Sequence, residues 1–185
     1  MNHQNTATQI GVRQWLVDSA HSEIGFSVTH LMISRVRGNF SDFSGTASFD
    51  PDNLEHGSIE VEIDAASIDT RDEDRDGHLR SEDFFDVEQY PVIRFASTSV
   101  EPVGSGGYNV HGELTIKGET RPVTLNAKFS EPVPDPFGGT RIGASAETKV
   151  NRSDFGLTWN QALETGGVLV GDEISISINA QLVLS

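Results

Sequence analysis

The chain has no cysteine among its 185 residues, and this absence removes several classes of chemistry at once. Without cysteine there is no disulfide framework, no thiolate nucleophile and no metal site built on cysteine sulfur. Aromatic residues other than phenylalanine are also scarce, with two Trp and two Tyr against 10 Phe.

Positive charge is scarce too, and this limits the partners. Thirteen Lys and Arg stand against 28 Asp and Glu, which gives a formal net charge of −15. A nucleic-acid partner needs a basic face, so we expect no nucleic acid. The same charge opposes docking on an anionic membrane, and no apolar run approaches the ~20 residues of a membrane-spanning helix. We expect no stable membrane insertion.

The first 14 residues, MNHQNTATQIGVRQ, lack the apolar core and the small-residue cleavage site of a secretory signal. As written, the chain is expected to be cytoplasmic; a mature form carrying an added Met would be periplasmic or secreted. The length suits one domain with a substantial core. We predict a flexible N-terminal arm over residues 1–13 and a single domain over residues 14–185.

Most of the chain alternates between apolar and polar residues with a period of two, as half-buried strands do. Residues 58–64 give the clearest case, where Ile59, Val61 and Ile63 alternate with polar side chains. Short turns separate about eight such segments, which favours antiparallel order, and closure into a barrel removes exposed edges. The prediction is an all-β, eight-stranded antiparallel barrel, either filled by side chains or holding one small ligand.

Residues 72–85 (DEDRDGHLRSEDFF) break this alternation and are predicted to form a short helical insertion. Its Phe84 and Phe85 would anchor the helix on the barrel or act as a gate. The insertion begins like the D-x-D-x-D-G loop of a calcium-binding EF-hand, but residues 58–64 indicate a strand where an EF-hand has its entering helix. We interpret the acids as a helix N-terminus, where they favour the positive end of the dipole, and expect no metal site.

No arrangement of residues indicates catalysis, so no catalytic residue is assigned and an enzyme is not expected. The sequence has no G-x-S-x-G elbow, no glycine-rich phosphate cradle and no H-E-x-x-H pair. His30 ends the apolar face formed by Ile24, Phe26 and Val28. It is expected either to cap the strand or to orient a ligand at the mouth of an apolar cavity.

Three segments carry a resemblance to a known family: residues 15–45 (WLVDSAHSEIGFSVTHLMISRVRGNFSDFSG), residues 76–91 (DGHLRSEDFFDVEQYP) followed by FAST at 95–98, and GELTIKG at 112–118 together with NRSDFGLTW at 151–159. In this order they resemble the YceI family of polyisoprenoid-binding, lipocalin-like proteins. The resemblance implies a lipocalin-like extended barrel around a long apolar tunnel. It also implies a carrier of polyisoprenoids, quinone-like lipids or other long amphiphiles.

We therefore expect non-catalytic binding, sequestration or transport of an isoprenoid or quinone-like long-chain lipid, with no further cofactor. Phe155, Leu157 and Trp159 alternate and are expected to form a strand-like face at the other end of the tunnel. The expected tunnel lining comprises Ile24, Phe26, Val28, His30, Phe40, Phe43, Ile59, Val61, Phe84, Phe85, Phe95, Leu114, Leu125, Phe129, Phe155, Leu157 and Trp159.

The sequence leaves the head group and two rival functions open. Alternation places Arg35 and Arg37 opposite Val36, so both are expected to point outward. Together with the net charge, this favours a neutral head group such as a quinone over a pyrophosphate. The rivals are an enzyme that acts on a bound lipid and a solid barrel that serves as a stress-response or protein-interaction module. Nothing in the sequence decides whether the chain forms a homodimer.

Overall fold

The computed structural model describes residues 11–185, so most of the arm predicted over residues 1–13 lies outside the described residues. The strands are β1 (Arg13–Val17), β2 (Glu23–His30), β3 (Ser34–Phe40), β4 (Phe43–Asp50), β5 (Asn53–Asp64), β6 (Ile68–Asp69), β7 (Val92–Val103), β8 (Gly107–Ile116), β9 (Glu119–Phe129), β10 (Val133–Pro134), β11 (Thr140–Asn151) and β12 (Val170–Leu184). The helices are α1 (Glu73–Arg80) and the 3-10 helices η1 (Ser19–His21), η2 (Ala65–Ser67), η3 (Gly104–Gly106) and η4 (Arg152–Phe155).

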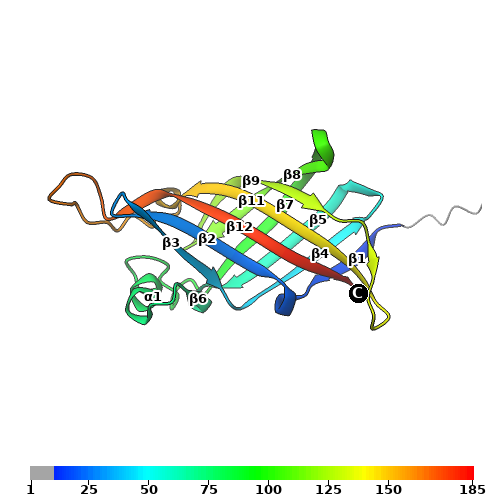
Figure 1. Ribbon diagram of the computed structural model, residues 1–185, viewed down its shortest axis with the longest axis horizontal. Helices are drawn as coiled ribbons and strands as arrows, with labels where there is room; N and C mark the ends of the chain where they lie inside the picture. Colours follow the sequence, from blue (N-terminus) through cyan, green and yellow to red (C-terminus); the bar gives the residue numbers. More distant parts are fainter. Residues whose placement is uncertain (1–10) are drawn as a thin grey trace, which may run out of the picture.

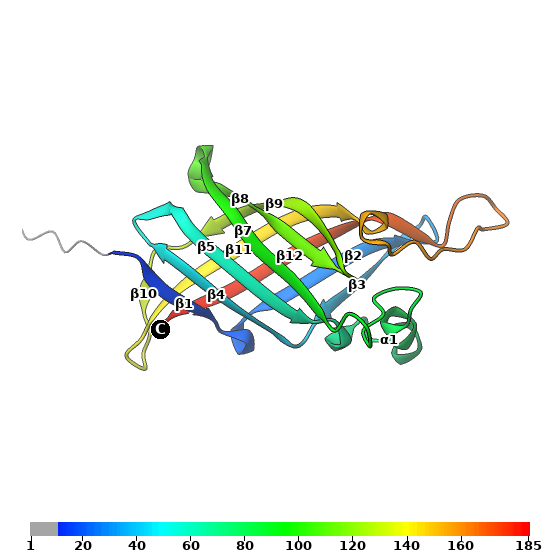
Figure 2. The ribbon, with the colours of Figure 1, turned by 180° about the vertical axis from the view of Figure 1, so that it is seen from behind.

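Eight of these strands close into the predicted antiparallel barrel, in the order β1, β4, β5, β7, β8, β9, β11 and β12 (Figures 1 and 2). Strand β12 closes it, because it pairs with β11 along one edge and with β1 along the other. On that second edge, β1 covers only the last residues of β12, and β2 covers Val170–Asn179. Strands β2, β3 and β6 thereby extend the wall at one end.

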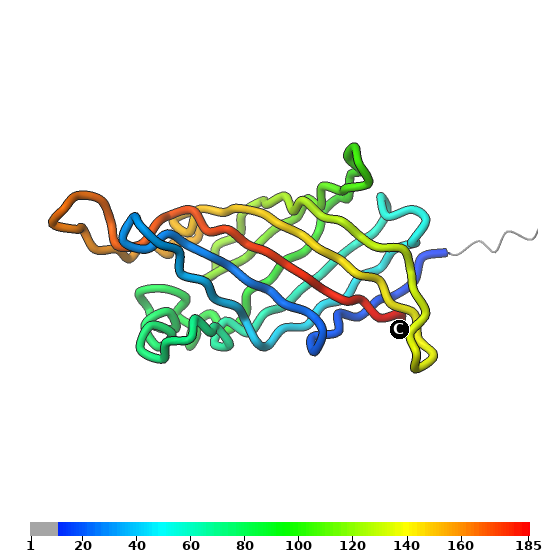
Figure 3. The backbone as a smooth tube through the Cα atoms, viewed as in Figure 1, coloured from blue at the N-terminus to red at the C-terminus, as the bar shows by residue number. Residues whose placement is uncertain are grey.

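The elongated barrel has two different ends (Figure 1). One carries α1, the β2–β3 turn and the segment 156–169, and we call it the helix end. The other carries β10, the start of β1 and the C-terminus, and we call it the terminal end. The tube in Figure 3 shows that the segment 156–169 reaches beyond the strands along the long axis.

Phenylalanine rings pack over glycines on the inner face of the wall. An added Cβ would lie 2.6 Å from Cζ of Phe26 at Gly38, and 2.5 Å from Cζ of Phe95 at Gly112. Each ring therefore occupies the space that a side chain would take on the neighbouring strand. This arrangement lets a strongly curved sheet close without a steric clash.

A cluster of buried side chains, separate from the core around the middle of the barrel, fills the terminal end. Trp15 and Phe49 stack with their ring centroids 5.3 Å apart, and Ala47, Ile142 and Leu182 complete the cluster. Trp15 is 1% exposed and Phe49 is 2% exposed, so the barrel is plugged here.

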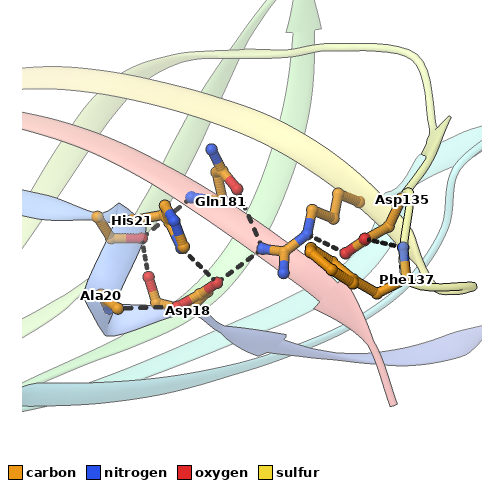
Figure 4. Close-up of polar contacts among 8 residues, drawn as sticks. Asp18, Ala20, His21, Asp135, Phe137 and Gln181 are labelled. Carbon is orange, nitrogen blue, oxygen red and sulfur yellow. Dashed lines mark hydrogen bonds and ion pairs between the residues drawn. The ribbon is translucent and has the colours of Figure 1, made fainter.

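Arg141 forms ion pairs with two carboxylates at this end, those of Asp18 and Asp135, which Figure 4 labels. Its Nη1 donates to Asp18 at 2.6 Å and to the side-chain oxygen of Gln181 at 3.0 Å, and its Nε donates to Asp135. The hydrogen bond from Arg141, followed by that from His21, lowers the pKa of Asp18 from 3.8 to about 2. We call this group the Arg141 clamp. It joins β11 to Gln181 of β12, to Asp18 directly after β1 and to Asp135 in the β10–β11 loop.

The predicted helical insertion is confirmed, with α1 covering the motif that imitates an EF-hand loop. Asp72 caps the helix by accepting from the backbone N–H of Arg75 at 3.0 Å. Asp76 is buried and accepts from the backbone N–H of Thr70 at 2.9 Å and from its hydroxyl. Arg80 donates to two backbone carbonyls of the η2–β6 segment, at 2.8 and 3.1 Å. These bonds fasten α1 to the barrel.

The insertion differs from the prediction in one respect. The helix ends at Arg80, so Phe84 and Phe85 lie in the turns that follow it. The backbone N–H of Phe85 donates to the carbonyl of Leu79 at 3.0 Å, so the chain folds back beneath the helix. This reversal directs both rings toward the barrel.

Candidate ligand cavity

An apolar cavity of about 260 Å³ runs inside the barrel. Side chains along nearly all of β12 line it, from Val170 at the helix end to Leu182 at the terminal end. At a rise of roughly 3.3 Å per residue this is about 40 Å of strand. The tilt of barrel strands reduces it to an axial length on the order of 30 Å. A volume this small over such a length makes the cavity a narrow tunnel.

Small side chains leave the middle of the barrel hollow. Ala146 pairs with Ala127, and Ala144 pairs with Ala180, so two alanine pairs face the interior from three neighbouring strands. Facing residues such as Ile176 and Leu125 are only half-buried although they point inward. In a barrel filled by side chains these residues would be fully buried.

Fifteen of the 17 residues predicted for the tunnel wall line this cavity. They are Ile24, Phe26, Val28, Phe40, Phe43, Ile59, Val61, Phe84, Phe85, Phe95, Leu114, Leu125, Phe129, Phe155 and Leu157. Their contact with a ligand remains a prediction.

The other two predicted residues, His30 and Trp159, lie outside the cavity wall. His30 is the last residue of β2, and its carbonyl accepts from the backbone N–H of Ile33 in the β2–β3 turn. Trp159 packs against His78 and Phe84, with ring centroids 4.6 and 5.5 Å away. It therefore supports the segment that lines the cavity.

The predicted strand-like face at residues 155–159 is wrong. Phe155 ends η4, Gly156 adopts a left-handed conformation with φ of 75°, and the chain continues without a strand. The reason lies in Arg152, whose guanidinium donates hydrogen bonds to the backbone carbonyls of Leu157 and Trp159. In a strand, these carbonyls would accept from the N–H groups of a neighbouring strand.

Arg152 is the residue that sequence reasoning missed most clearly. It lines the cavity, is 7% exposed, and donates to the carbonyls of Gly171 (2.8 Å), Leu157 (2.7 Å), Trp159 (2.9 Å) and Val170 (3.3 Å). Among the described residues no carboxylate lies within 4.0 Å of its guanidinium. Burial lowers the pKa of Arg152. The sequence signal was a single Arg within an otherwise polar and aromatic motif.

Most of the remaining missed wall residues are aliphatic, and nearly all of these lie on strands. They are Val17, Ile63, Ile68, Leu79, Ile93, Val110, Ile116, Val123, Val150, Val170, Ile174, Ile176, Ile178 and Leu182. Five alanines, Gly25 and the polar residues Ser22, Glu23, Thr46, Ser145 and Thr148 also line the wall. Ile174, Ile176 and Ile178 alternate along β12, and all three line the cavity.

The wall offers little for catalysis or for a metal. No histidine is among the residues that line the cavity, and their one carboxylate belongs to Glu23, which is exposed. Within residues 11–185, no helix is long and apolar enough to cross a membrane. Apart from Glu23 and the hydroxyl side chains of the lining, the polar features of this site are thus a buried cation and the backbone around it.

A closed antiparallel barrel around an apolar tunnel defines a class of small-molecule-binding barrel. Residues 15–182 match the model of the YceI-like domain, and the chain belongs to this family. A UPF0312 protein of Vibrio cholerae is 41% identical over 138 residues, which cover 75% of this chain and 73% of that protein.

Solved structures share the fold. BcnA of Burkholderia cenocepacia has a TM-score of 0.79 and 28% sequence identity, over 89% of this chain and 98% of that one. A polyisoprenoid-binding domain from Saccharophagus degradans, implicated in plant cell wall breakdown, has a TM-score of 0.67 over 92% of this chain and 98% of that one. Because only 16% of the aligned residues are identical, this likeness shows a shared fold and nothing more.

Proposed function

We propose that this protein binds one linear isoprenoid or quinone-like lipid inside its barrel, and that it carries or sequesters this lipid without chemical change. The observation that carries the proposal is the long, narrow and apolar cavity, which suits a single extended hydrocarbon chain better than a compact ligand. The description of the Saccharophagus degradans domain as polyisoprenoid-binding supports the same ligand class.

Burial of the tail would supply most of the binding energy. Each CH₂ group moved from water into an apolar wall contributes about 0.8 kcal/mol, so a few isoprene units suffice. Ordering of the flexible chain and displacement of side chains offset part of this gain. Affinity should therefore rise with tail length and level off once the tunnel is full.

Arg152 favours a neutral head group over a pyrophosphate. Four of its five N–H groups already donate to backbone carbonyls, so at most one is left for a further acceptor. One donor suits a quinone carbonyl or a phenol oxygen, whereas a pyrophosphate calls for several donors and cations. Arg35 and Arg37 are exposed on the outer face, as their alternation predicted, and so do not supply them.

The two rival functions receive less support. An enzyme that acts on a bound lipid would need an acid, a base or an activated nucleophile at the wall. The lining residues offer one exposed carboxylate, and the hydroxyl groups of Ser22, Thr46, Ser145 and Thr148 have no histidine beside them in the lining. A solid barrel that acts only as an interaction module would have a filled interior, whereas this barrel contains a cavity of about 260 Å³.

The test is to extract the purified protein with organic solvent and analyse the extract by mass spectrometry. We expect a prenyl lipid at close to one molecule per chain, with a neutral head group. An extract without lipid, together with no uptake of added prenyl quinones, would contradict the proposal. A stoichiometric lipid that the protein hydrolyses or oxidises on incubation would favour the enzyme instead.

A further inference from the structure

The turn between β2 and β3 breaks the local rules for a hairpin. Leu31 and Met32 are its two central residues, with φ of 51° and 63°, and the N–H of Ile33 donates to the carbonyl of His30 at 3.2 Å. Leu31, Met32 and Ile33 form the loop of this hairpin. A turn with positive φ at both central positions strongly prefers Asn-Gly, because side chains with a bulky Cβ substituent are strained there. Folding alone would not place leucine and methionine here.

These apolar side chains also face solvent. Ile33 is 84% exposed and Met32 is 59% exposed, and Leu31 and Val168 are exposed as well. Val168 belongs to the neighbouring segment 156–169, which meets the turn. The N–H of Leu31 donates to the carbonyl of Leu169 at 2.9 Å. A Cβ added to Gly167 would lie 3.2 Å from Cγ of Met32. We call Leu31, Met32, Ile33 and Val168 the apolar tip.

The charge around the apolar tip differs from that of the rest of the chain. Residues 24–41 contain no Asp or Glu although the chain has 28, and they include Arg35 and Arg37. The segment 156–169 contains a single acid, Glu164. Because charges more than about 8–10 Å apart are largely screened at physiological salt, the local balance governs contact with a surface. The two segments that form the apolar tip thus bring little negative charge of their own, although the acid-rich helix α1 lies at the same end of the barrel. Burial of apolar side chains, and not charge, would therefore supply most of the contact energy.

We propose that the apolar tip docks on the surface of a lipid bilayer. Bulky apolar side chains on a projecting turn, with basic residues behind them, match the interfacial zone of a membrane, where apolar groups enter and cations meet head groups. The contact is peripheral, since only one turn and one neighbouring side chain take part. It fits a reversible encounter with the membrane.

The location of the apolar tip connects it with the cavity. Val28 and Val170 both line the cavity, and His30 pairs with Val170 immediately before the turn. The apolar tip thus begins about three residues from the cavity wall at the helix end, where Figure 1 places the β2–β3 turn beside the segment 156–169. A lipid that passes between a bilayer and the cavity at this end would avoid a long path through water.

A bilayer fits the apolar tip better than a protein partner does. A standard protein interface buries roughly 800 Å² on each side over 20–30 residues. Four side chains on a convex turn do not supply that area. A bilayer needs no complementary shape, and it accepts a small convex tip.

The experiment measures co-sedimentation with vesicles of phosphatidylcholine, alone and mixed with phosphatidylglycerol. The test variant combines Leu31→Asn, Met32→Gly and Ile33→Thr, which installs the preferred residues of this turn while removing its apolar side chains. The matched control is Phe137→Ser, because Phe137 is 94% exposed but lies in the β10–β11 loop at the terminal end (Figure 1).

We expect the parent and the Phe137→Ser variant to bind the vesicles equally, and the triple variant to bind at least about tenfold more weakly. Thermal unfolding of the triple variant should match or exceed that of the parent, which excludes misfolding. Equal binding by the triple variant, or no binding by the parent, would overturn the proposal. The triple variant should still take up a prenyl quinone added from detergent, so the docking test is independent of the proposed function.

Discussion

The indole of Trp159 lies edge-on against the imidazole of His78, with ring centroids 4.6 Å apart and planes at 85°. This contact joins the segment that follows η4 to the helix α1, two parts of the chain far apart in sequence. Phe84 packs against both rings, and the Arg152 guanidinium lies 6.0 Å from the Phe84 ring centroid. We call α1 and the segment that follows η4 the cover of the cavity at the helix end. Aromatic contacts, and not strand pairing, hold these two parts of the cover together.

Replacing Trp159 with Ala should loosen this cover. Trp159 is half-buried, so we expect a loss of about 2–3 kcal/mol of unfolding free energy, below the range for a fully buried Trp. Urea unfolding gives the loss, and amide hydrogen exchange over residues 73–91 should speed up more than in the strands. Glu164→Ala, on the same segment, should change stability by less than about 0.5 kcal/mol. Unchanged exchange in α1 would refute this role for Trp159.

The Arg141 clamp predicts a specific acid sensitivity. Because the pKa of Asp18 falls from 3.8 to about 2 on folding, its ionised form stabilises the folded state at any pH above 3.8. That contribution is lost as the pH falls from 3.8 toward 2. The urea midpoint of Asp18→Asn should therefore fall less steeply over this window than that of the parent. Asp154→Asn, which leaves the Arg141 clamp intact, should follow the parent.

Two glycines should respond to alanine in opposite directions. A Cβ at Gly112 would lie 2.5 Å from Cζ of Phe95 and 2.6 Å from the carbonyl oxygen of Ala96, so Gly112→Ala should cost about 1–3 kcal/mol. Gly77 lies inside α1 with no atom within 4 Å of such a Cβ, so Gly77→Ala should stabilise by about 0.5–1 kcal/mol. Thermal unfolding of both variants measures this; two changes of the same sign would contradict it.

The head-group preference can be tested directly. With at most one free N–H on Arg152, a prenyl quinone should bind at least about tenfold more tightly than a prenyl pyrophosphate with the same tail, which corresponds to about 1.4 kcal/mol. Competition between the two lipids for the purified protein measures the ratio. Tighter binding of the pyrophosphate would show that the head group finds cations other than Arg152.

Alternation along single strands was enough to predict the barrel and most of its wall, because a period of two decides which side chains point inward. Alternation did not predict that the barrel contains a cavity. The free volume depends on which residues face each other, and Ala146 meets Ala127 across strands that are separate in the sequence. It also failed at residues 155–159, where the hydrogen bonds of one arginine override the pattern.

The central claim is that the tunnel holds the tail of a lipid, and filling the tunnel tests it most directly. Ala146→Phe places a ring in the middle of the cavity, and Glu147→Phe places the same ring on the exposed outer face of the same strand. The measurement is a binding titration of a long-chain prenyl quinone to the parent and to both folded variants. We predict that the parent and Glu147→Phe bind alike and that Ala146→Phe binds at least about a hundredfold more weakly. Equal binding by all three proteins would place the lipid outside the barrel and contradict the account.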